Sequence, residues 1–263
     1  MKPTSDQKKK KIAIVFLTYI PSKELIAFSN DLQKSCDSSV YICIDDDTYD
    51  HTQISVRTLK YRSEVCAHNG FKNLLLYCTA KLRPCAWEKA MYHFCVIDKS
   101  YDFVWFIEDD VLITSLQTIS DIDKKYPEAD LLCRSNYPLD ITSKWPNLWT
   151  ARSLPKPWFV SMMCACRLSK NLLFKIHEFV HINKTLHFHE VFFNILAYQH
   201  KLKVENPDEL KGILWKHIWN INNITLGHVY HPVKAQYLHD ILRRQLTIKT
   251  TKKRKSTHLR IVR

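Results

Sequence analysis

Glycine is scarce in this sequence: only Gly70, Gly212 and Gly227 occur among 263 residues. Phosphate-binding loops of the G-x-G-x-x-G and G-x-x-x-x-G-K types need several closely spaced glycines, because the backbone must turn tightly and approach the phosphates. Neither loop can be formed here. This excludes Rossmann dehydrogenases, P-loop NTPases and kinases with a glycine-rich loop.

Long apolar runs are also missing. The best candidate, residues 12–20 (IAIVFLTYI), follows four lysines as a signal peptide would, but it is too short to span a membrane and no small-residue cleavage site follows it. We interpret this segment as a buried strand and expect a cytoplasmic protein.

The cysteines do not form a recognisable motif. They are nine in number, which is odd, and no C-x-x-C occurs, which argues against a disulfide framework and against a thiolate zinc site. Most lie in apolar stretches, such as VYICI at 40–44 and YHFCVI at 92–97, where cysteine behaves as a small hydrophobic residue. We therefore expect buried thiols in a reducing compartment.

The net charge of +13 is concentrated at the two ends of the chain. Residues 1–11 carry five lysines and one aspartate, and residues 249–263 carry seven basic residues and no acid, so residues 12–248 hold only +2. Blocks of like charge at chain ends are usually solvated and flexible, although they can also contact anionic lipid or phosphate backbones. We predict basic flexible tails at 1–11 and 249–263 around a single domain at 12–248.

What is present is typical of a folded α/β domain. The chain is 46% apolar and 25% charged, as expected for a globular protein with a sizeable core. Buried strands that alternate with helices indicate βαβ units on a parallel sheet. We expect strands at 12–20, 40–44, 103–107, 129–133 and 158–167. In the first half we expect a helix that begins at Pro21-Ser22, two helices over roughly 63–80 and 86–98, and a short helix that ends near Pro127. In the second half we expect helices from Ser169 to about 181, at 189–200 and near 235–244. Between the two halves we expect a long irregular loop at 138–158.

Two of the expected strands end in clustered acids, Asp45 to Asp47 and Glu108 to Asp110. Ligands of open α/β sheets bind beyond the carboxyl ends of the strands. Adjacent carboxylates repel unless they share a cation, and divalent metals with oxygen ligands often bridge to substrate phosphates. The alternative is that these acids are solvated turn residues or N-caps.

The segment FVWFIEDDVLI (103–113) resembles the DXD-type motif of GT-A glycosyltransferases in its Glu-Asp-Asp form. The resemblance implies a GT-A type α/β fold with a Rossmann-like, mostly parallel central sheet flanked by helices and a small acceptor-side subregion near the C-terminus. It also implies a nucleotide-sugar half at 12–134 and an acceptor half at 135–248. By resemblance, Asp110 is the direct metal ligand, while Glu108 and Asp109 face the ribose, the sugar or the metal's waters.

Other segments follow the order of the same family. By resemblance, Thr18 and Tyr19 lie along the nucleoside, and Asp45 or Asp46 contacts the base or ribose. The helix that carries Lys89 precedes the motif strand, and Lys89 is expected to approach phosphate.

The second half of the chain supplies the remaining candidates. Glu190 begins the helix of HFHEVFFNILAYQ, where many inverting GT-A enzymes place a general base; the alternative is a first-turn glutamate favoured by the helix dipole. In VYHPVK, His231 matches a second metal ligand and Lys234 a diphosphate contact, whereas His231 can also be a turn residue and His228 competes with it.

Aromatic side chains indicate the acceptor side of the site. Trp158, at the end of the Trp- and Pro-rich loop, is expected to stack on an acceptor sugar, since aromatic faces pack well on apolar sugar faces. The alternative is that at least one of the loop tryptophans Trp145 and Trp149 belongs to the core.

These features predict a metal-dependent, inverting glycosyltransferase. It would use Mn²⁺ or Mg²⁺ and move a sugar from a nucleoside-diphosphate sugar, most readily a UDP-sugar, to a hydroxyl of a glycan or protein acceptor. One alternative is a sugar-phosphate nucleotidyltransferase, although that class needs a glycine-rich basic first loop, which LTYIPSKE (17–24) is not. A second is a basic nucleic-acid-binding protein, which the charge of only +2 on residues 12–248 disfavours, so we expect no specific nucleic-acid partner.

Overall fold

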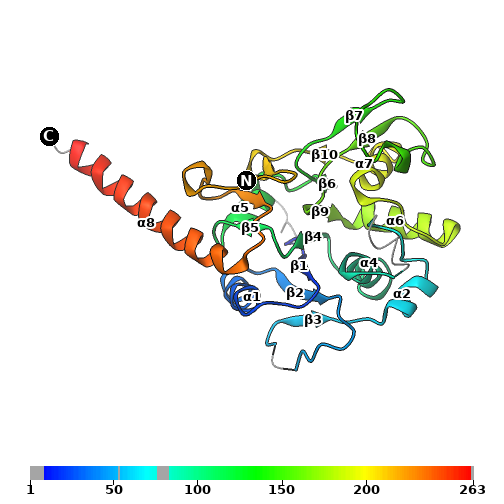
Figure 1. Cartoon of the computed structure of the whole chain (residues 1–263), viewed down its shortest axis with the longest axis horizontal. Coiled ribbons are helices and arrows are strands. Elements are labelled where there is room, and N and C mark those ends of the chain that lie inside the picture. Colours follow the sequence, from blue (N-terminus) through cyan, green and yellow to red (C-terminus); the bar gives the residue numbers. More distant parts are fainter. Residues whose placement is uncertain (1–8, 53, 76–82, 262–263) are drawn as a thin grey trace, which may run out of the picture.

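The computed structural model describes residues 9–52, 54–75 and 83–261, with side chains described as far as residue 249. A seven-stranded sheet in the order β10-β6-β9-β4-β1-β2-β3 forms its centre (Figure 1). Its strands are β1 (Ile12–Thr18), β2 (Ser39–Ile44), β3 (Arg57–Leu59), β4 (Phe103–Glu108), β6 (Leu131–Leu132), β9 (Ala165–Ser169) and β10 (Val204–Glu205). Every neighbouring pair is parallel except the two that involve β9. The expected α/β fold with a mostly parallel central sheet is therefore confirmed.

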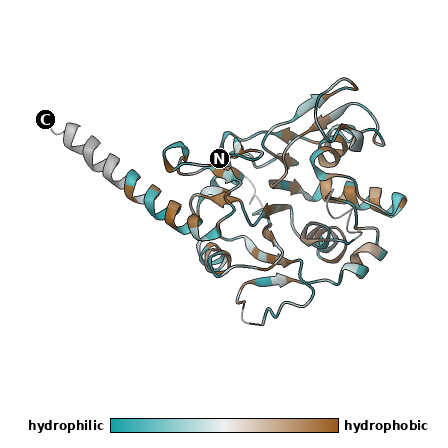
Figure 2. Ribbon diagram, viewed as in Figure 1, coloured by the Kyte–Doolittle hydropathy of each residue, from teal (hydrophilic) through white to brown (hydrophobic). Residues whose placement is uncertain are grey.

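Strand β1 shows why both faces of this sheet are covered. Ala13, Val15 and Leu17 belong to one core cluster, whereas Ile14 and Phe16 belong to the other, because successive side chains of a strand point to opposite faces. Strands buried on both faces need helices on both faces. Figure 2 shows hydrophobic segments gathered in these central strands and on the helices around them.

Helices flank the sheet on both sides (Figure 1). One face is covered by α1 (Lys23–Ser35) and α5 (Thr118–Lys125), and the other by α2 (Ser63–His68), α4 (Ala86–Tyr92), the π-helix η1 (His93–Ile97), α6 (Lys170–Asn183) and α7 (His189–Gln199). Two helix starts follow directly from the sequence. The hydroxyl of Ser22 accepts the backbone N–H of Leu25 at 3.0 Å, and that of Ser169 accepts the N–H of Leu172 at 3.1 Å.

A small sheet lies beside the main one in the order β11-β12-β5, formed by β11 (Gly212–Ile213), β12 (Val229–His231) and β5 (Leu112–Ile113). Glycine is required at position 212, because a Cβ atom there would lie 2.5 Å from both the Tyr230 ring and the Val229 carbonyl oxygen. This close approach of β11 to β12 holds the strand that ends at His231. The described chain also contains the hairpin of β7 (Tyr137–Leu139) and β8 (Trp158–Val160) and the short 3-10 helices η2 (Leu148–Thr150), η3 (Asp208–Leu210) and η4 (Ile221–Asn223).

Helix α8 (Gln236–Ile261) is longer than predicted and projects away from the body (Figure 1). The sequence predicted a helix near 235–244 followed by a flexible tail, but the helix continues to Ile261. No glycine or proline follows Pro232, and the segment is rich in Leu, Lys, Arg and Gln, which favour helix. Of the other predicted tail, 1–11, residues 1–8 lie outside the described part of the chain.

Two other predicted elements are shorter than expected. The helix expected over 63–80 ends at His68, because Gly70 follows with a φ of +85°, the left-handed conformation that commonly terminates helices; residues 76–80 lie outside the described part. The strand expected at 158–167 is divided into β8 and β9, and the backbone at 161–164 between them is irregular. Strand β8 pairs with β7, so the two ends of the loop expected to be irregular at 138–158 form a hairpin.

The thiols agree with the sequence in part. Eight cysteines lie in the described residues, all of them free, and every one except Cys36 is buried; Cys78 lies outside the described part. Across residues 9–52, 54–75 and 83–261, no helix is both long enough and apolar enough to cross a membrane.

Candidate active site

Glu108 ends strand β4 at the carboxyl edge of the main sheet. Its carboxylate Oε1 accepts a hydrogen bond from the indole Nε1 of the buried Trp87 at 2.8 Å, and its backbone N–H donates to the carbonyl oxygen of Cys164 at 2.9 Å. The indole from α4 and the backbone from the segment before β9 therefore fix both the side chain and the main chain of Glu108.

Asp109 is held by the neighbouring strand β1. The hydroxyl of Thr18 donates to its Oδ2 at 2.6 Å, and its backbone N–H donates to the carbonyl oxygen of Leu17 at 3.1 Å. Thr18, predicted to lie along a nucleoside, thus also orients the second acid of the motif.

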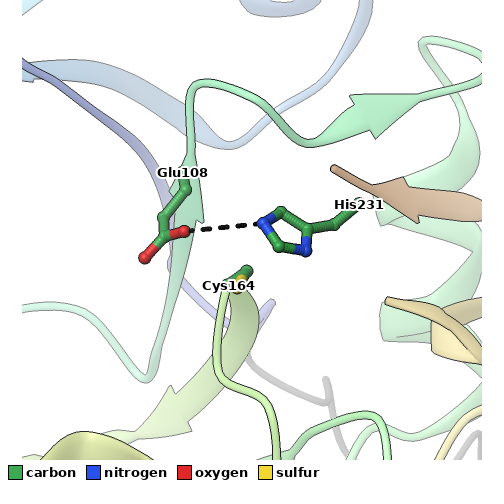
Figure 3. Close-up of side chains that lie close together, drawn as sticks. All are labelled: Glu108, Cys164 and His231. Atoms are coloured by element: carbon green, nitrogen blue, oxygen red, sulfur yellow. Dashed lines mark ion pairs between the residues drawn. The ribbon is translucent and has the colours of Figure 1, made fainter. Parts of the chain in front are cut away.

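Asp110 faces His231. The Nε2 atom of His231 lies 3.3 Å from Asp110 Oδ1 and 4.0 Å from Glu108 Oε2 (Figure 3 shows the latter pair). The other ring nitrogen, Nδ1, lies 2.9 Å from the carbonyl oxygen of Leu214. Because a carbonyl oxygen can only accept, Nδ1 carries a proton, and Nε2 of the neutral ring is left with a lone pair directed at the acids. The structure therefore brings together the two residues predicted to bind metal.

A pocket of about 580 Å³ opens in front of these acids. It is lined by Leu17, Thr18, Tyr19, Asp45, Arg83, Cys85, Ala86, Trp87, Glu108, Asp109 and Asp110. Six of the predicted donor and metal residues are thus gathered around one cavity: Thr18, Tyr19, Asp45, Glu108, Asp109 and Asp110. The Tyr19 side chain is exposed and free to cover a ligand, and the guanidinium of Arg83 lies 3.0 Å from Asp45 Oδ1.

Three predicted donor residues do not line this pocket: Lys89, Asp46 and Lys234. Lys89 is fully buried, with its Nζ 2.6 Å from the backbone oxygen of Asp45 and 2.5 Å from Asp47 Oδ1, so it holds the turn after β2 instead of approaching phosphate. Asp46 accepts hydrogen bonds from the backbone and hydroxyl of Thr48, both at 2.7 Å, and stabilises the same turn. The cation that the pocket presents is Arg83, which we did not predict.

Glu190 stands in the first turn of α7, next to the site. Its desolvation, reinforced by the negative charge of Glu108 and opposed by His231, raises the pKa of its carboxyl group to about 7. That its pKa responds to both residues places its carboxylate within electrostatic reach of the acid cluster. A pKa near neutrality suits a group that must accept a proton at physiological pH.

The charges of the site are poorly balanced. Burial raises the pKa of both Glu108 and Asp109, and the charge of Asp110 raises that of Glu108 further. Burial alone would lower the pKa of His231, but the contact with Asp110 and the charges of Asp110 and Glu108 outweigh it and raise the pKa. One imidazole thus faces several acids, and a bound cation would relieve their repulsion.

The donor atoms present fit a divalent cation. Asp110 Oδ1 is buried and receives no hydrogen bond from the described residues, while it faces the Nε2 atom of His231. A carboxylate oxygen whose neighbouring donor is this imidazole, and the imidazole nitrogen itself once the ring is neutral, are suitable ligands for Mn²⁺ or Mg²⁺, with Asp110 as the oxygen ligand.

The remaining predicted residues lie elsewhere. Trp158 is buried in the core with its indole N–H bonded to the backbone oxygen of Leu154 at 2.8 Å, so it cannot stack on an acceptor. Lys234 is exposed and lines a different cavity, between α8 and residues 216–221. His228 bonds through its backbone to Thr114, which leaves His231 as the histidine of the site.

Three site residues were missed by sequence reasoning: Arg83, Cys164 and the orienting role of Trp87. Arg83 follows a segment without periodicity, and Cys164 lies in a run of apolar residues where a thiol looks structural. Of the three, only Trp87 was indicated by the sequence, because it lies on the helix that the resemblance placed along the donor pocket.

Comparisons with known proteins give weak likenesses of fold. No protein-family model and no curated protein sequence matches the chain. Among solved structures, it is similar to an active-site mutant of LgtC, with 12% sequence identity and a TM-score of 0.47 over 89% of this chain and 96% of that one. It is also similar to mouse xyloside xylosyltransferase 1 in its apo form, with 9% identity and a TM-score of 0.39 over 76% of this chain and 85% of that one. Neither likeness is close enough to assign an activity to this chain.

Proposed function

We propose that this protein is a metal-dependent glycosyltransferase that moves a sugar from a nucleoside-diphosphate sugar, preferably a UDP-sugar, to a hydroxyl group of a glycan or protein. The observation that carries the proposal is the contact of His231 with Asp110, which lines a pocket of about 580 Å³, with Glu190 within electrostatic reach of Glu108 and His231. A cavity of that size matches those that bind drug-sized ligands. The Glu-Asp-Asp resemblance supports the same function.

The pocket offers separate groups for separate parts of such a donor. Tyr19 and Asp45 line the pocket and would contact the nucleoside, while Arg83 adds a positive charge suited to phosphate oxygens. Asp110 and His231 would hold Mn²⁺ or Mg²⁺, which when bound would stabilise the charge that develops on a leaving diphosphate. Thr18 and Trp87 keep Asp109 and Glu108 in place during this binding.

Glu190 would act as the general base. Its carboxylate would take the proton of the acceptor hydroxyl as that oxygen bonds to the anomeric carbon of the sugar and the bond to the diphosphate oxygen breaks. A pKa of about 7 keeps a substantial fraction of Glu190 ionised at neutral pH and still makes it a far better base than an ordinary glutamate. Attack from the side opposite the leaving group inverts the anomeric configuration.

The test is a screen of UDP-, GDP-, ADP- and dTDP-sugars with the full-length protein, with Mn²⁺, Mg²⁺ or EDTA. We expect at least one nucleotide sugar to raise the melting temperature and to be hydrolysed slowly, in both cases only with a divalent cation, since a ligand that binds the native state stabilises it. NMR of the product formed with an acceptor should show the inverted anomer. If no nucleotide sugar binds or reacts in the presence of either metal, the proposal is wrong; a retained configuration would remove the role of Glu190.

A further inference from the structure

Cys164 brings a sulfur atom to the acid cluster. Its Sγ, one carboxylate oxygen of Glu108 and one ring nitrogen of His231 all lie within 4.8 Å of one another. Figure 3 shows the three side chains converging from β4, from the segment before β9 and from β12. The hydrogen bond from the Glu108 backbone N–H to the Cys164 carbonyl oxygen, 2.9 Å long, fixes the spacing of two of the three.

From this arrangement we propose that Glu108, Cys164 and His231 form a cation site with a thiolate ligand, which binds zinc-class cations such as Zn²⁺ and Co²⁺ more tightly than Mn²⁺ or Mg²⁺. The inference deepens the proposed function, on which it rests for the role of the bound cation. It adds a sulfur ligand to a site whose predicted ligands were an oxygen and a nitrogen, and the ligand set decides which metal the protein selects.

The geometry suits tetrahedral ligation with only small adjustments. Zinc bonds of about 2.0–2.3 Å place tetrahedral ligands about 3.3–3.8 Å apart, and the three donor atoms lie within 4.8 Å of one another. His231 is already oriented by the contact of its Nδ1 with the Leu214 carbonyl oxygen, the kind of outer hydrogen bond that metal-binding histidines make. Three protein ligands with a fourth position open are typical of a catalytic zinc site, and Asp110 Oδ1 lies 3.3 Å from the His231 nitrogen.

The surroundings of Cys164 differ from those of Cys95, which lies in the opposite core cluster. Cys95, for comparison, is enclosed by the opposite core cluster, with its thiol 3.5 Å from the Leu173 carbonyl oxygen. Cys164 instead lies among the carboxylates of Glu108, Asp110 and Glu190, all of which act on it electrostatically.

The preference follows from ligand chemistry. Thiolate and imidazole ligands favour Zn²⁺ and Co²⁺, while Mn²⁺ and Mg²⁺ favour oxygen. Because His231 belongs both to this set and to the proposed Asp110–His231 site, a zinc-class cation and Mn²⁺ would exclude each other. Zn²⁺ would therefore either replace Mn²⁺ as the working metal or inhibit the Mn²⁺-dependent reaction.

Cobalt binding tests the thiolate ligand directly, without any measurement of activity. The metal-free full-length protein and its Cys164→Ser and Cys95→Ser variants would each be titrated with CoCl₂ under anaerobic conditions. We expect the near-ultraviolet band of a cobalt–thiolate bond in the wild type and in Cys95→Ser, and its loss in Cys164→Ser. Zn²⁺ affinity measured by competition should fall at least about 100-fold in Cys164→Ser, because loss of an outer-shell partner alone typically costs about 10–100-fold. Mn²⁺ affinity should change less than about threefold, since oxygen-preferring ions gain little from sulfur.

The proposal is overturned if the wild type shows no such band, if Cys164→Ser keeps it, or if the Zn²⁺ affinities of the two are equal. Should Cys164→Ser fail to fold, mass spectrometry of the alkylated wild type decides instead: Zn²⁺ must slow the alkylation of Cys164 and leave that of the partly exposed Cys36 unchanged. A cobalt–thiolate band without sugar transfer would retain the metal site and remove the glycosyltransferase. Metal-dependent sugar transfer without the cobalt–thiolate band would retain the glycosyltransferase and remove the thiolate metal site.

Discussion

His231 ends strand β12 of the small sheet, Asp110 lies in the turn that joins β4 of the main sheet to β5, and the His231 Nε2 atom lies 3.3 Å from Asp110 Oδ1. Two further contacts tie their segments together: the backbone N–H of Val233 donates to the Asp110 carbonyl oxygen at 2.7 Å, and the amide of Gln236 donates to the Asp109 carbonyl oxygen at 3.2 Å. The end of β12 and the start of α8 are thereby fastened to the acidic turn, so the late part of the chain completes a site that the early part begins.

Replacement of Asp110 by alanine tests the predicted metal ligand. We expect Mn²⁺-dependent binding of nucleotide sugar and turnover to be lost, because His231 alone cannot hold the ion, while the melting temperature stays within a few degrees of the wild type. Isothermal titration with Mn²⁺ and a thermal melt measure the two effects. Asp121→Ala, which removes an exposed acid of α5, is the control and should bind Mn²⁺ normally. Normal turnover by Asp110→Ala would exclude it as a ligand.

Arg83 is expected to contribute to donor binding. Its guanidinium lines the pocket beside Asp45 and is partly exposed, so it can bind phosphate oxygens without a large rearrangement. Arg83→Ala should weaken the binding of nucleoside diphosphate by about tenfold, which corresponds to about 1.4 kcal/mol, as expected for one charge-assisted hydrogen bond. Lys124→Ala, which removes an exposed cation on α5, provides the comparison. Equal dissociation constants for Arg83→Ala and the wild type would remove Arg83 from the donor site.

Lys89 is expected to act on stability. Its buried ammonium group is paired with Asp47 and with the backbone of Asp45, so Lys89→Met would leave the carboxylate of Asp47 without its partner. Because the Asp47 side chain is 30% exposed and can be hydrated, we expect a cost below that of a fully buried pair, about 1–3 kcal/mol. Urea denaturation should show a loss of that size, and Lys124→Met should show almost none. A phosphate contact, which the sequence predicted, would instead weaken nucleotide binding at unchanged stability.

The sequence carried enough to predict five of the seven strands of the main sheet, all except β3 and β10, and the acidic end of β4. A run of five large apolar residues followed by three acids is typical of a buried strand that ends at a polar edge of the sheet. Serines that begin apolar-periodic segments are recognisable N-caps, as Ser22 and Ser169 are. The general position of His231 also followed, but only through the resemblance to a family.

Other parts of the site were hidden for physical reasons. Strands β5 and β11 contain two residues each, which is too short for a hydrophobic period, so nothing in the sequence announced the small sheet that positions His231. Lys89 and Arg83 have the same charge, and only the packing of α4 decides which is buried and which faces the pocket. Trp158 could not be distinguished from a surface aromatic, because its burial depends on β7 pairing with β8.

The pKa of Glu190 has a consequence for stability that is independent of any substrate. Folding raises the pKa of this acid to about 7, above its ordinary value, so the folded state binds the proton more tightly than the unfolded state. Stability contributed by the protonated group is therefore present at pH 4 and lost as the pH rises through 7. Glu190→Gln, which stays neutral, should be more stable than the wild type at pH 8, by up to about 3 kcal/mol, and equally stable at pH 4. Urea denaturation at both pH values in EDTA measures this; Glu178→Gln, an exposed glutamate of α6, should show no such gain.

Catalysis should show the opposite effect of the same residue. A general base must be ionised, so kcat of the wild type should increase with pH, with a midpoint near 7 set by Glu190, and reach a plateau above it. Glu190→Gln keeps the size of the side chain but cannot take a proton. Its turnover should fall by about 10²–10⁴-fold and lose this pH dependence, whereas donor affinity should change little, because the lost interaction belongs to the transition state. If Glu190→Gln turns over normally, the base is another group. Asp140 is the next to test, although hydrogen bonds from Thr142 lower its pKa and make it the weaker base.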